Sequence, residues 1–295
     1  MKTIVVPTDF SEYALFALKV AARIAKKVNA RIKLLHACNI PTTGVKEFSY
    51  YADFYKEIKI NADYQLKKLM ELKFLENINV EKFLIPDQLV SQVLIDAKFK
   101  NTDLIVIGSH GTSGFSSILI GSNTEKIVRI ANAPVLTIKN ENENFNIKKM
   151  VFASDFYEGT DAVFNKIKFL FNAYNAKLYL LKVITPSDFE STPSSFRLMN
   201  DFMVQNSLKN CSVNIYNSYS IESGIIEFSQ ETGADLVVIP THGRTGFSHL
   251  INGSLAENLA VHEPKPVLSI KIPVATKPVV KVSSSDSIYE NLDLF

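Results

Sequence analysis

The sequence predicts an α/β protein of two tandem units, each with a doubly wound parallel five-stranded sheet. The first observation behind this prediction is a repeat, since DLIVIGSHGTSGFSSILIGSNTE (103–125) returns as DLVVIPTHGRTGFSHLINGSLAE (235–257) at a constant offset of 132. The second is that short apolar runs alternate with segments of helical periodicity in both copies. Strands buried on both faces and separated by helices are typical of a parallel sheet with helices on both sides.

The amino-terminal ends of the copies correspond at a larger offset. TIVVPTDFSE (3–12) matches KMVFASDFYE (149–158) at an offset of 146. The difference, 146 minus 132, means that the second copy has 14 fewer residues between its second strand and the repeated motif. The copies therefore share a framework whose length changes in its middle.

The first copy supplies the elements of one unit in order. Strands are expected as short apolar runs at 3–6, 32–37, 80–85, 104–107 and 135–138. Helices are expected from Ser11, where Ala14, Leu18, Ala21 and Ala25 recur at helical spacing, and then at 54–73, at 89–99 and from residue 122.

The connections divide the chain into four parts. The polar run NENENFN indicates a linker at 140–146 between a first domain, 1–139, and a second domain, 147–272. Residues 273–295 have no counterpart in the first copy and are expected to form a loosely packed tail. Within the second domain, TPSDFESTPSS (185–195) has the composition of a surface loop.

The fold predicts where a ligand would bind. Doubly wound sheets bind ligands outside the carboxyl ends of their strands, where the strand order reverses. The ends of the first strand (Pro7, Thr8, Asp9) and of the fourth (Ile107, Gly108) are therefore expected to be neighbours across one crevice.

The glycine-rich motif suggests an anion site beside that crevice. Gly111 allows the loop to approach a ligand closely, and Gly121 with Ser122 opens a helix whose first amides have no helical partner. Thr124 adds a hydroxyl in the first turn. The same residues also allow a capping box, because Ser122 with Glu125 fits S-x-x-E.

Composition and missing motifs exclude several classes. A formal net charge of +2 on 295 residues gives little attraction for nucleic acid or anionic membranes, and no signal peptide or membrane span is expected. The two cysteines, Cys38 and Cys211, occupy non-equivalent places and suit a reducing cytoplasm. The chain lacks both the P-loop and the G-x-G-x-x-G motif. His110 and His242 are expected to shape loops, so neither a catalytic residue nor a protein-only metal site is predicted.

The spacing Gly108, two residues, Gly111, nine residues, Gly121-Ser122, after a strand ending PTDFSE, resembles the nucleotide-binding branch of the universal stress protein family. The resemblance covers 1–139 and 147–271 and implies a Rossmann-like fold of the adenine nucleotide alpha hydrolase type. It implies ATP or AMP as ligand, Mg²⁺ with the phosphates, and a site formed by Pro7, Thr8, Asp9, Ala37, Ile107, Gly108, Gly111, Gly121, Ser122, Asn123 and Thr124. The residues themselves leave a second role open for Asp9, which with Glu12 could cap the first helix.

The resemblance also implies a function and an assembly. It implies a stress-response sensor or regulator, with a slow ATP hydrolase or adenylyl-transfer enzyme and a ligand-free interaction module as the alternatives. The tandem copies resemble a covalently linked dimer in which strands 135–138 and 267–270 meet across a pseudo-twofold axis. Association of two chains and an unidentified protein partner are compatible with this arrangement.

The second copy departs from the motif at four positions. Pro240 replaces Gly108, and the residues equivalent to Pro7, Ile120 and Thr124 are Ala153, Asn252 and Ala256. Proline removes an amide donor and adds a ring at the strand end. A weaker second site is therefore predicted at Asp155, Val183, Gly243, Gly253 and Ser254.

Overall fold

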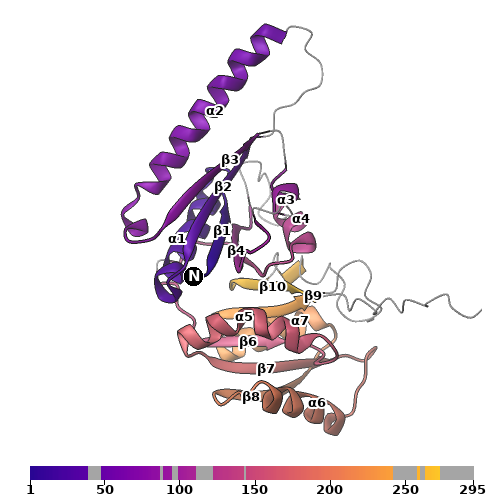
Figure 1. Ribbon diagram of the computed structural model, residues 1–295. Helices are drawn as coiled ribbons and strands as arrows, with labels where there is room; N and C mark the ends of the chain where they lie inside the picture. Colours follow the sequence, from indigo (N-terminus) through magenta and orange to yellow (C-terminus); the bar gives the residue numbers. More distant parts are fainter. Residues whose placement is uncertain are drawn as a thin grey trace, which may run out of the picture.

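A computed structural model describes residues 1–38, 48–86, 89–94, 99–110, 122–142, 144–241, 258–259 and 263–272, with only the backbone of 48–55, 86 and 122. Ten strands form one sheet in the order β3 (Val80–Pro86), β2 (Arg31–Cys38), β1 (Thr3–Pro7), β4 (Leu104–Gly108), β5 (Val135–Ile138), β10 (Val267–Lys271), β9 (Leu236–Thr241), β6 (Lys149–Ala153), β7 (Lys177–Ile184) and β8 (Cys211–Asn217) (Figure 1). Strands β1 to β5 belong to the first half and β6 to β10 to the second.

The two predicted sheets are joined into one. Neighbouring strands within each half are parallel, whereas β5 and β10 pair antiparallel, with Val135 opposite Ser269 and Thr137 opposite Val267. The predicted α/β fold is confirmed, and the last strands of the two halves meet as expected for a pseudo-dimer.

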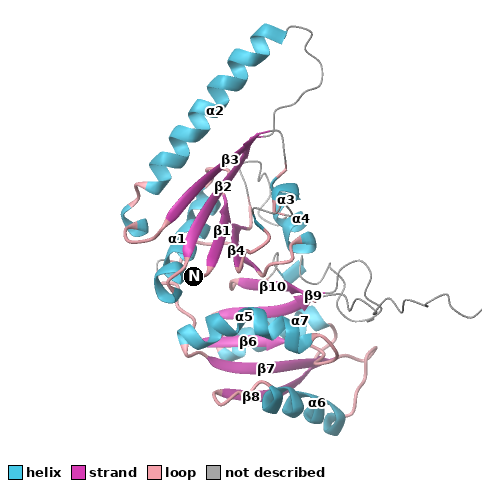
Figure 2. Cartoon of the chain, viewed as in Figure 1, coloured by secondary structure: helices cyan, strands magenta, loops and turns pink. Residues whose placement is uncertain are grey.

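Helices cover both faces of the sheet (Figure 2). Side chains alternate between the two faces of each strand, so each face of the sheet has its own buried cluster and its own set of helices. One face carries α1 (Glu12–Val28), α2 (Phe48–Met70), α5 (Thr160–Tyr174) and α6 (Thr192–Gln205). The other carries α3 (Val90–Val93), α4 (Ser122–Ile130) and α7 (Ile221–Thr232).

Two predicted helix boundaries differ from the structure. The helix expected at 54–73 is α2, which begins earlier at Phe48, ends at Met70 and is followed by a short 3₁₀ turn, η1 (Lys73–Leu75). Of the helix expected at 89–99, the structure shows Val90–Val93, and 95–98 lie outside the described residues. Within the described parts, no helix is long and apolar enough to cross a membrane.

The surface loop predicted at 185–195 extends too far, because residues 192–195 belong to α6, which begins at Thr192. Ser191 is the N-cap, its side chain accepts a bond from the Ser194 amide, and Pro193 lies in the first turn. Serine followed by proline favours a helix start as strongly as a loop. Ser195 is fully buried.

The polar linker is packed against the protein at two points. Phe145 is 4% exposed and makes an edge contact with Tyr174 of α5. Glu141 pairs with Lys19 of α1. The linker composition predicted a connecting segment, but it did not predict that an isolated phenylalanine would enter the core.

Hydrogen bonds from lysines of one half to carbonyl groups of the other half reinforce the β5·β10 junction. The Lys139 ammonium, just after β5, donates to the Glu263 carbonyl and lies 3.4 Å from the Leu259 carbonyl oxygen. In the other direction, Lys166 of α5 donates to the Asn132 carbonyl at 2.9 Å. Each half therefore supplies a cation to carbonyl oxygens of the other.

Lys139 should make the stability of this junction depend on pH. Burial lowers the pKa of Lys139 to about 8, although the Glu263 carboxylate acts to raise it. Folding therefore favours neutral Lys139, so its contribution to the free energy of unfolding should increase as pH rises from about 8 towards the ordinary value of 10.5. In urea unfolding across this range, Lys139→Met should show a smaller increase than the parent; equal slopes would contradict the prediction.

Candidate functional site

A hydrogen-bonded turn follows β1 at the expected crevice. The Thr8 amide donates to the Leu35 carbonyl at 2.8 Å, which holds the turn against β2. The Thr8 hydroxyl accepts from the Phe10 amide at 3.1 Å, and Asp9 Oδ1 accepts from the Ser11 amide at 3.0 Å. Phe10 has a φ of 65°, a left-handed conformation that these side-chain bonds support.

The turn answers the question of what caps the first helix. Ser11 is the N-cap of α1, and its side chain accepts from the Ala14 amide. Asp9 lies two residues earlier and orders the turn instead, so the prediction that Asp9 with Glu12 could cap the helix is wrong.

The second half repeats this turn almost bond for bond. The Ser154 amide donates to Leu181, the Ser154 hydroxyl accepts from Phe156, and Asp155 Oδ1 accepts from Tyr157 at 3.1 Å. Phe156 has a φ of 62°. Because the turn is the same in both halves, differences between the two crevices must come from the residues around it.

His36 is a part of the first crevice that the sequence did not indicate. Its Nδ1 lies 2.7 Å from the Thr8 carbonyl oxygen, and its ring centroid is 4.4 Å from that of Phe10. The contact joins the end of β2 to the turn after β1. A single histidine in a strand carries no pattern that would have revealed this role.

The carboxyl end of β4 is bonded to the start of α4. The buried Thr124 hydroxyl donates to the Gly108 carbonyl at 2.9 Å. Since a hydroxyl has only one hydrogen, the side chain of Thr124 in this arrangement has no donor left for a phosphate. Asn123, on the same turn, is exposed.

Several predicted contacts lie outside the described residues. These are Gly111, Gly121, Gly243, Gly253, Ser254 and the side chain of Ser122. The structure brings together the predicted residues Pro7, Thr8 and Asp9 at the end of β1, Ala37 at the end of β2, and Ile107 and Gly108 at the end of β4, because β1 lies between β2 and β4.

Packing gives Gly108 a role of its own. A Cβ atom at Gly108 would lie 2.7 Å from both the carbonyl carbon and the oxygen of Tyr13 in α1. The second half has Gly159 at the position of Tyr13 (13 plus 146), and α5 begins at Thr160, two positions later than α1 (160 minus 158). The helix start that requires glycine at 108 is therefore altered in the half that carries Pro240.

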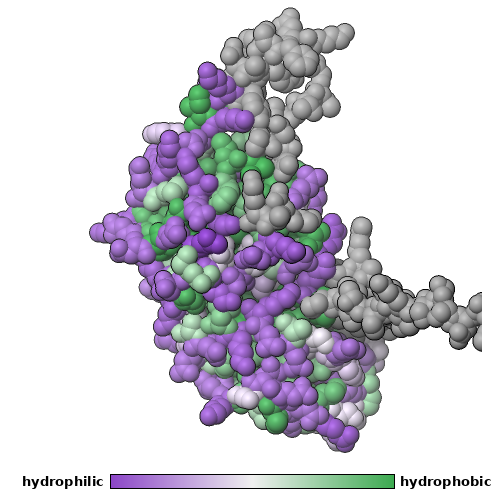
Figure 3. All heavy atoms as spheres, viewed as in Figure 1, coloured by the Kyte–Doolittle hydropathy of each residue, from purple (hydrophilic) through white to green (hydrophobic). Residues whose placement is uncertain are grey.

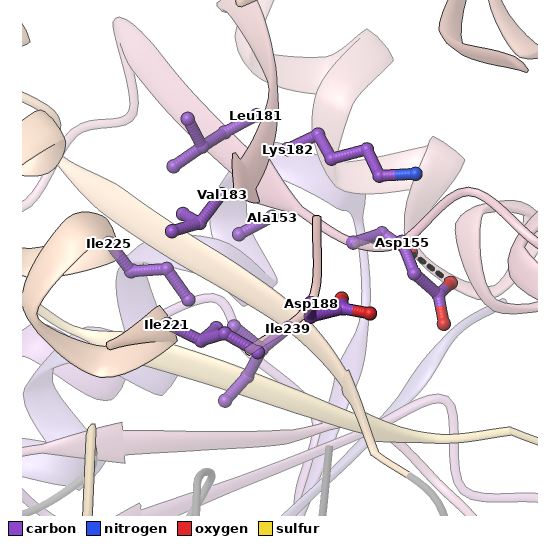
Figure 4. A pocket seen from close by; sticks show the side chains of 10 residues that line it. Ala153, Asp155, Leu181, Lys182, Val183, Asp188, Ile221, Ile225 and Ile239 are labelled. Atoms are coloured by element: carbon purple, nitrogen blue, oxygen red, sulfur yellow. Dashed lines mark hydrogen bonds between the residues drawn. The ribbon is translucent and has the colours of Figure 1, made fainter. Parts of the chain in front are cut away.

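The crevice of the second half contains a small cavity of about 30 Å³ (Figure 4). It is lined by Ala153, Ser154, Asp155, Leu181, Lys182, Val183, Asp188, Ile221, Ile225 and Ile239. This volume is enough to hold a water molecule. Both described residues of the predicted second site, Asp155 and Val183, line the cavity.

Val183 lines the second crevice at the position that Ala37 has in the first half (37 plus 146). It packs so closely against α7 that a Cβ atom at Gly224 would lie 2.6 Å from Val183 Cγ1. The equivalent side chain of the first half, Ala37, has two methyl groups fewer.

A partly buried ion pair also distinguishes the second crevice. Lys182, at the position of His36, donates to Glu190 Oε2 at 2.6 Å, and the same carboxylate accepts from Tyr157 Oη at 2.8 Å and from Ser195 Oγ at 3.1 Å. Burial acts to raise the pKa of Glu190, but the bonds from Lys182, Tyr157 and Ser195 outweigh it and lower the pKa overall. The bond to Glu190 raises the pKa of Tyr157 to about 12.

This network was not predicted, because its members are spread over a turn, a strand, a loop and a helix. It fastens the connection between β7 and α6 beside the cavity, with Asp188 from that connection lining the cavity itself. Among the described residues, no group of three or more His, Cys, Asp or Glu side chains is arranged to hold a metal ion.

The fold and the strand-end turns define a tandem doubly wound α/β protein with the same hydrogen-bonded turn after the first strand of each half. The chain belongs to the universal stress protein family, whose profile matches residues 1–139 and 146–271.

Individual relatives agree with the family assignment. The chain is 30% identical to a universal stress protein of Methanocaldococcus jannaschii over 48% of this chain and 96% of the relative. It is 22% identical to one from Synechocystis over 92% of this chain and all of the relative. In structure it is similar to a universal stress protein of Archaeoglobus fulgidus, with a TM-score of 0.72, 23% identity, and coverage of 92% of this chain and 98% of that one. That similarity shows the fold.

Proposed function

We propose that the first half binds an adenine nucleotide, ATP or AMP, with Mg²⁺ on the phosphates, and that the protein acts as a stress-response regulator. The observation that carries the proposal is the neighbourhood of β1 and β4, between which the strand order reverses. The switch point of a doubly wound sheet is where such folds bind nucleotides.

The residues around the switch point support a tight nucleotide site in the first half and a weaker one in the second. We expect the nucleoside to lie beside the Thr8–Phe10 turn and the small Ala37 side chain. The first amides of α4 and the glycine-rich motif before it suit the phosphates. Val183 and Pro240 make the second half a weaker site, and the remaining glycines Gly243 and Gly253 with Ser254 are its phosphate candidates.

The test is to identify and count the ligand. Mass spectrometry of material released by heating the freshly purified chain should find an adenine nucleotide, and calorimetry with ATP or AMP, with and without Mg²⁺, should give one tight site per chain. ADP among the released products would call for a hydrolysis assay. Absence of binding, or two sites of equal affinity, would overturn the proposal.

Exchanging the equivalent residues of the two crevices should locate the site. Ala37→Val adds two methyl groups where the nucleoside is proposed to lie, so nucleotide affinity should fall at least about tenfold, the effect of about 1.4 kcal/mol of overpacking. The matched control, Val183→Ala, changes the same position of the second half and should leave the tight site unaffected. A loss of affinity in the control alone would place the tight site in the second half.

A further inference from the structure

A groove runs along the exposed side of α1, where the first half, the linker and the second half meet. It consists of two adjoining hollows of about 520 and 360 Å³ that share Arg23 and Lys26. The lining residues, here called the α1 groove, are Lys19, Ala22, Arg23, Lys26, Lys27, Phe74, Asn144, Phe145, Asn146 and Tyr174. Hydrophilic and apolar surface alternate over the part of the molecule where Figure 1 places α1 (Figure 3).

The groove carries positive charge that is not neutralised. Lys19 pairs with Glu141, whereas Arg23, Lys26 and Lys27 are exposed and form no ion pair with any described residue. Two of these cations have a structural explanation, because Lys26 and Lys27 lie in the last turn of α1 and favour the negative end of the helix dipole. That explanation does not cover Arg23, nor the aromatic walls.

Aromatic side chains lie between the cations. Phe74 of η1 lines one hollow, and Phe145 and Tyr174 line the other, where the Lys27 ammonium lies 5.8 Å from the Tyr174 ring centroid. Burial raises the pKa of Tyr174 to about 12, so its hydroxyl remains protonated near neutrality. The groove therefore offers cations and apolar surface in alternation.

The dimensions favour a short peptide over a nucleic acid. Lys19 and Lys27 are eight residues apart, about 12 Å along the helix and the span of about four extended peptide residues. Tight nucleic-acid binding uses many phosphate contacts and a strongly basic surface, whereas this chain has a net charge of +2.

We propose that the α1 groove docks an acidic segment of a partner protein, in which Asp or Glu alternates with large apolar side chains. Carboxylates would pair with Arg23, Lys26 and Lys27, and the apolar side chains would cover Phe74 and Tyr174. Since the lining comes from both halves and the linker, a docked segment contacts the two halves at once. The proposal does not depend on nucleotide binding.

A synthetic peptide can test the groove in the full chain. DSIYENLDLF has the required alternation, being residues 286–295 of this sequence, and serves as a fluorescent probe for anisotropy titrations. Binding should saturate and weaken with salt. Arg23→Glu with Lys26→Glu should weaken it at least about tenfold, the loss of one ion-paired contact or more. Replacing the three carboxylates of the peptide by amides should do the same.

The matched control changes the same charge elsewhere. Lys56→Glu with Lys68→Glu, two exposed lysines of α2, gives the same net charge and should leave the affinity unchanged. Equal losses of affinity in both variants would show that the effect comes only from the net charge of the protein, and this would overturn the proposal. Absence of saturable binding would overturn it as well. A ten-nucleotide single strand that binds the groove more tightly than the peptide would identify nucleic acid instead.

The chain's own tail is an alternative occupant that the same titration detects. If the probe binds only after Asp286→Asn, Glu290→Gln and Asp293→Asn in the full chain, residues 286–295 occupy the groove themselves. That result would replace the external partner by an internal one. All variants should melt cooperatively, since the replaced groove residues are exposed, and the loss of Lys26 at the end of α1 should lower the melting temperature only slightly.

Discussion

Gly108→Ala should destabilise the protein by about 1–3 kcal/mol, the usual cost of overpacking a core. The added Cβ atom would lie 2.7 Å from the carbonyl carbon and oxygen of Tyr13. Both are backbone atoms of α1, and α1 is held by its Ser11 cap and by its buried alanine face, so it cannot shift without disturbing the core. Urea unfolding of the nucleotide-free protein measures the loss.

The nucleotide-free state distinguishes packing from ligand binding at this glycine. If Gly108 serves α1, the full loss of stability appears without any ligand. Unchanged stability accompanied by weaker nucleotide binding would instead show that the glycine is needed for the ligand. The family motif and the packing constraint both require glycine at this position, so only the apo measurement separates them.

Glu190→Gln should cost about 1–3 kcal/mol, because it leaves the buried Lys182 ammonium without its charged partner, although solvent at the partly exposed carboxylate screens part of the effect. The side chain of Lys182 is 5% exposed, and Glu190 is its only ion-pair partner in the described part of the chain. The double variant Lys182→Met with Glu190→Gln should be more stable than Glu190→Gln alone, because it removes the uncompensated charge. Chemical unfolding of the parent, both single variants and the double variant gives the coupling energy directly.

The loss of stability caused by Glu190→Gln should also depend on pH. The pKa of Glu190 is lowered in the folded protein from an ordinary value of 4.5, so its stabilising contribution is present above that value and is lost as pH falls through the folded pKa. The stability difference between the parent and Glu190→Gln should therefore shrink below pH 4.5. A difference that stays constant from pH 7 to pH 3 would show that the carboxylate charge contributes nothing.

The repeat and the local periodicity predicted much of the fold. Apolar runs predicted all five strands of the first half, and the Ser11-initiated alanine pattern predicted α1, because burial against a sheet requires a periodic apolar face. Loop composition failed at Thr192–Ser195, where a Ser cap and a Pro in the first turn begin α6. The polar linker likewise gave no indication that Phe145 is buried.

The sequence likewise predicted some residues of the candidate site and missed others. The strand-end residues Thr8, Asp9 and Gly108 were predicted because topology alone brings the carboxyl ends of neighbouring parallel strands together. Asp155 and Val183 were predicted from the repeat, and both line the second cavity. His36, Lys182 and Glu190 were missed, because none of them belongs to a recurring pattern.

By itself, the sequence determined that this chain is a tandem α/β protein of the universal stress protein family with a different residue set in each crevice. Both conclusions follow from local periodicity and from comparison of one copy with the other. Only the tertiary structure decided why the sets differ. Tyr13 and Gly108 are 95 positions apart (108 minus 13), and their clash exists only once α1 crosses the end of β4. Whether such distant residues clash depends on differences of a few tenths of an ångström in their separation. The positions of residues along the sequence do not contain this information.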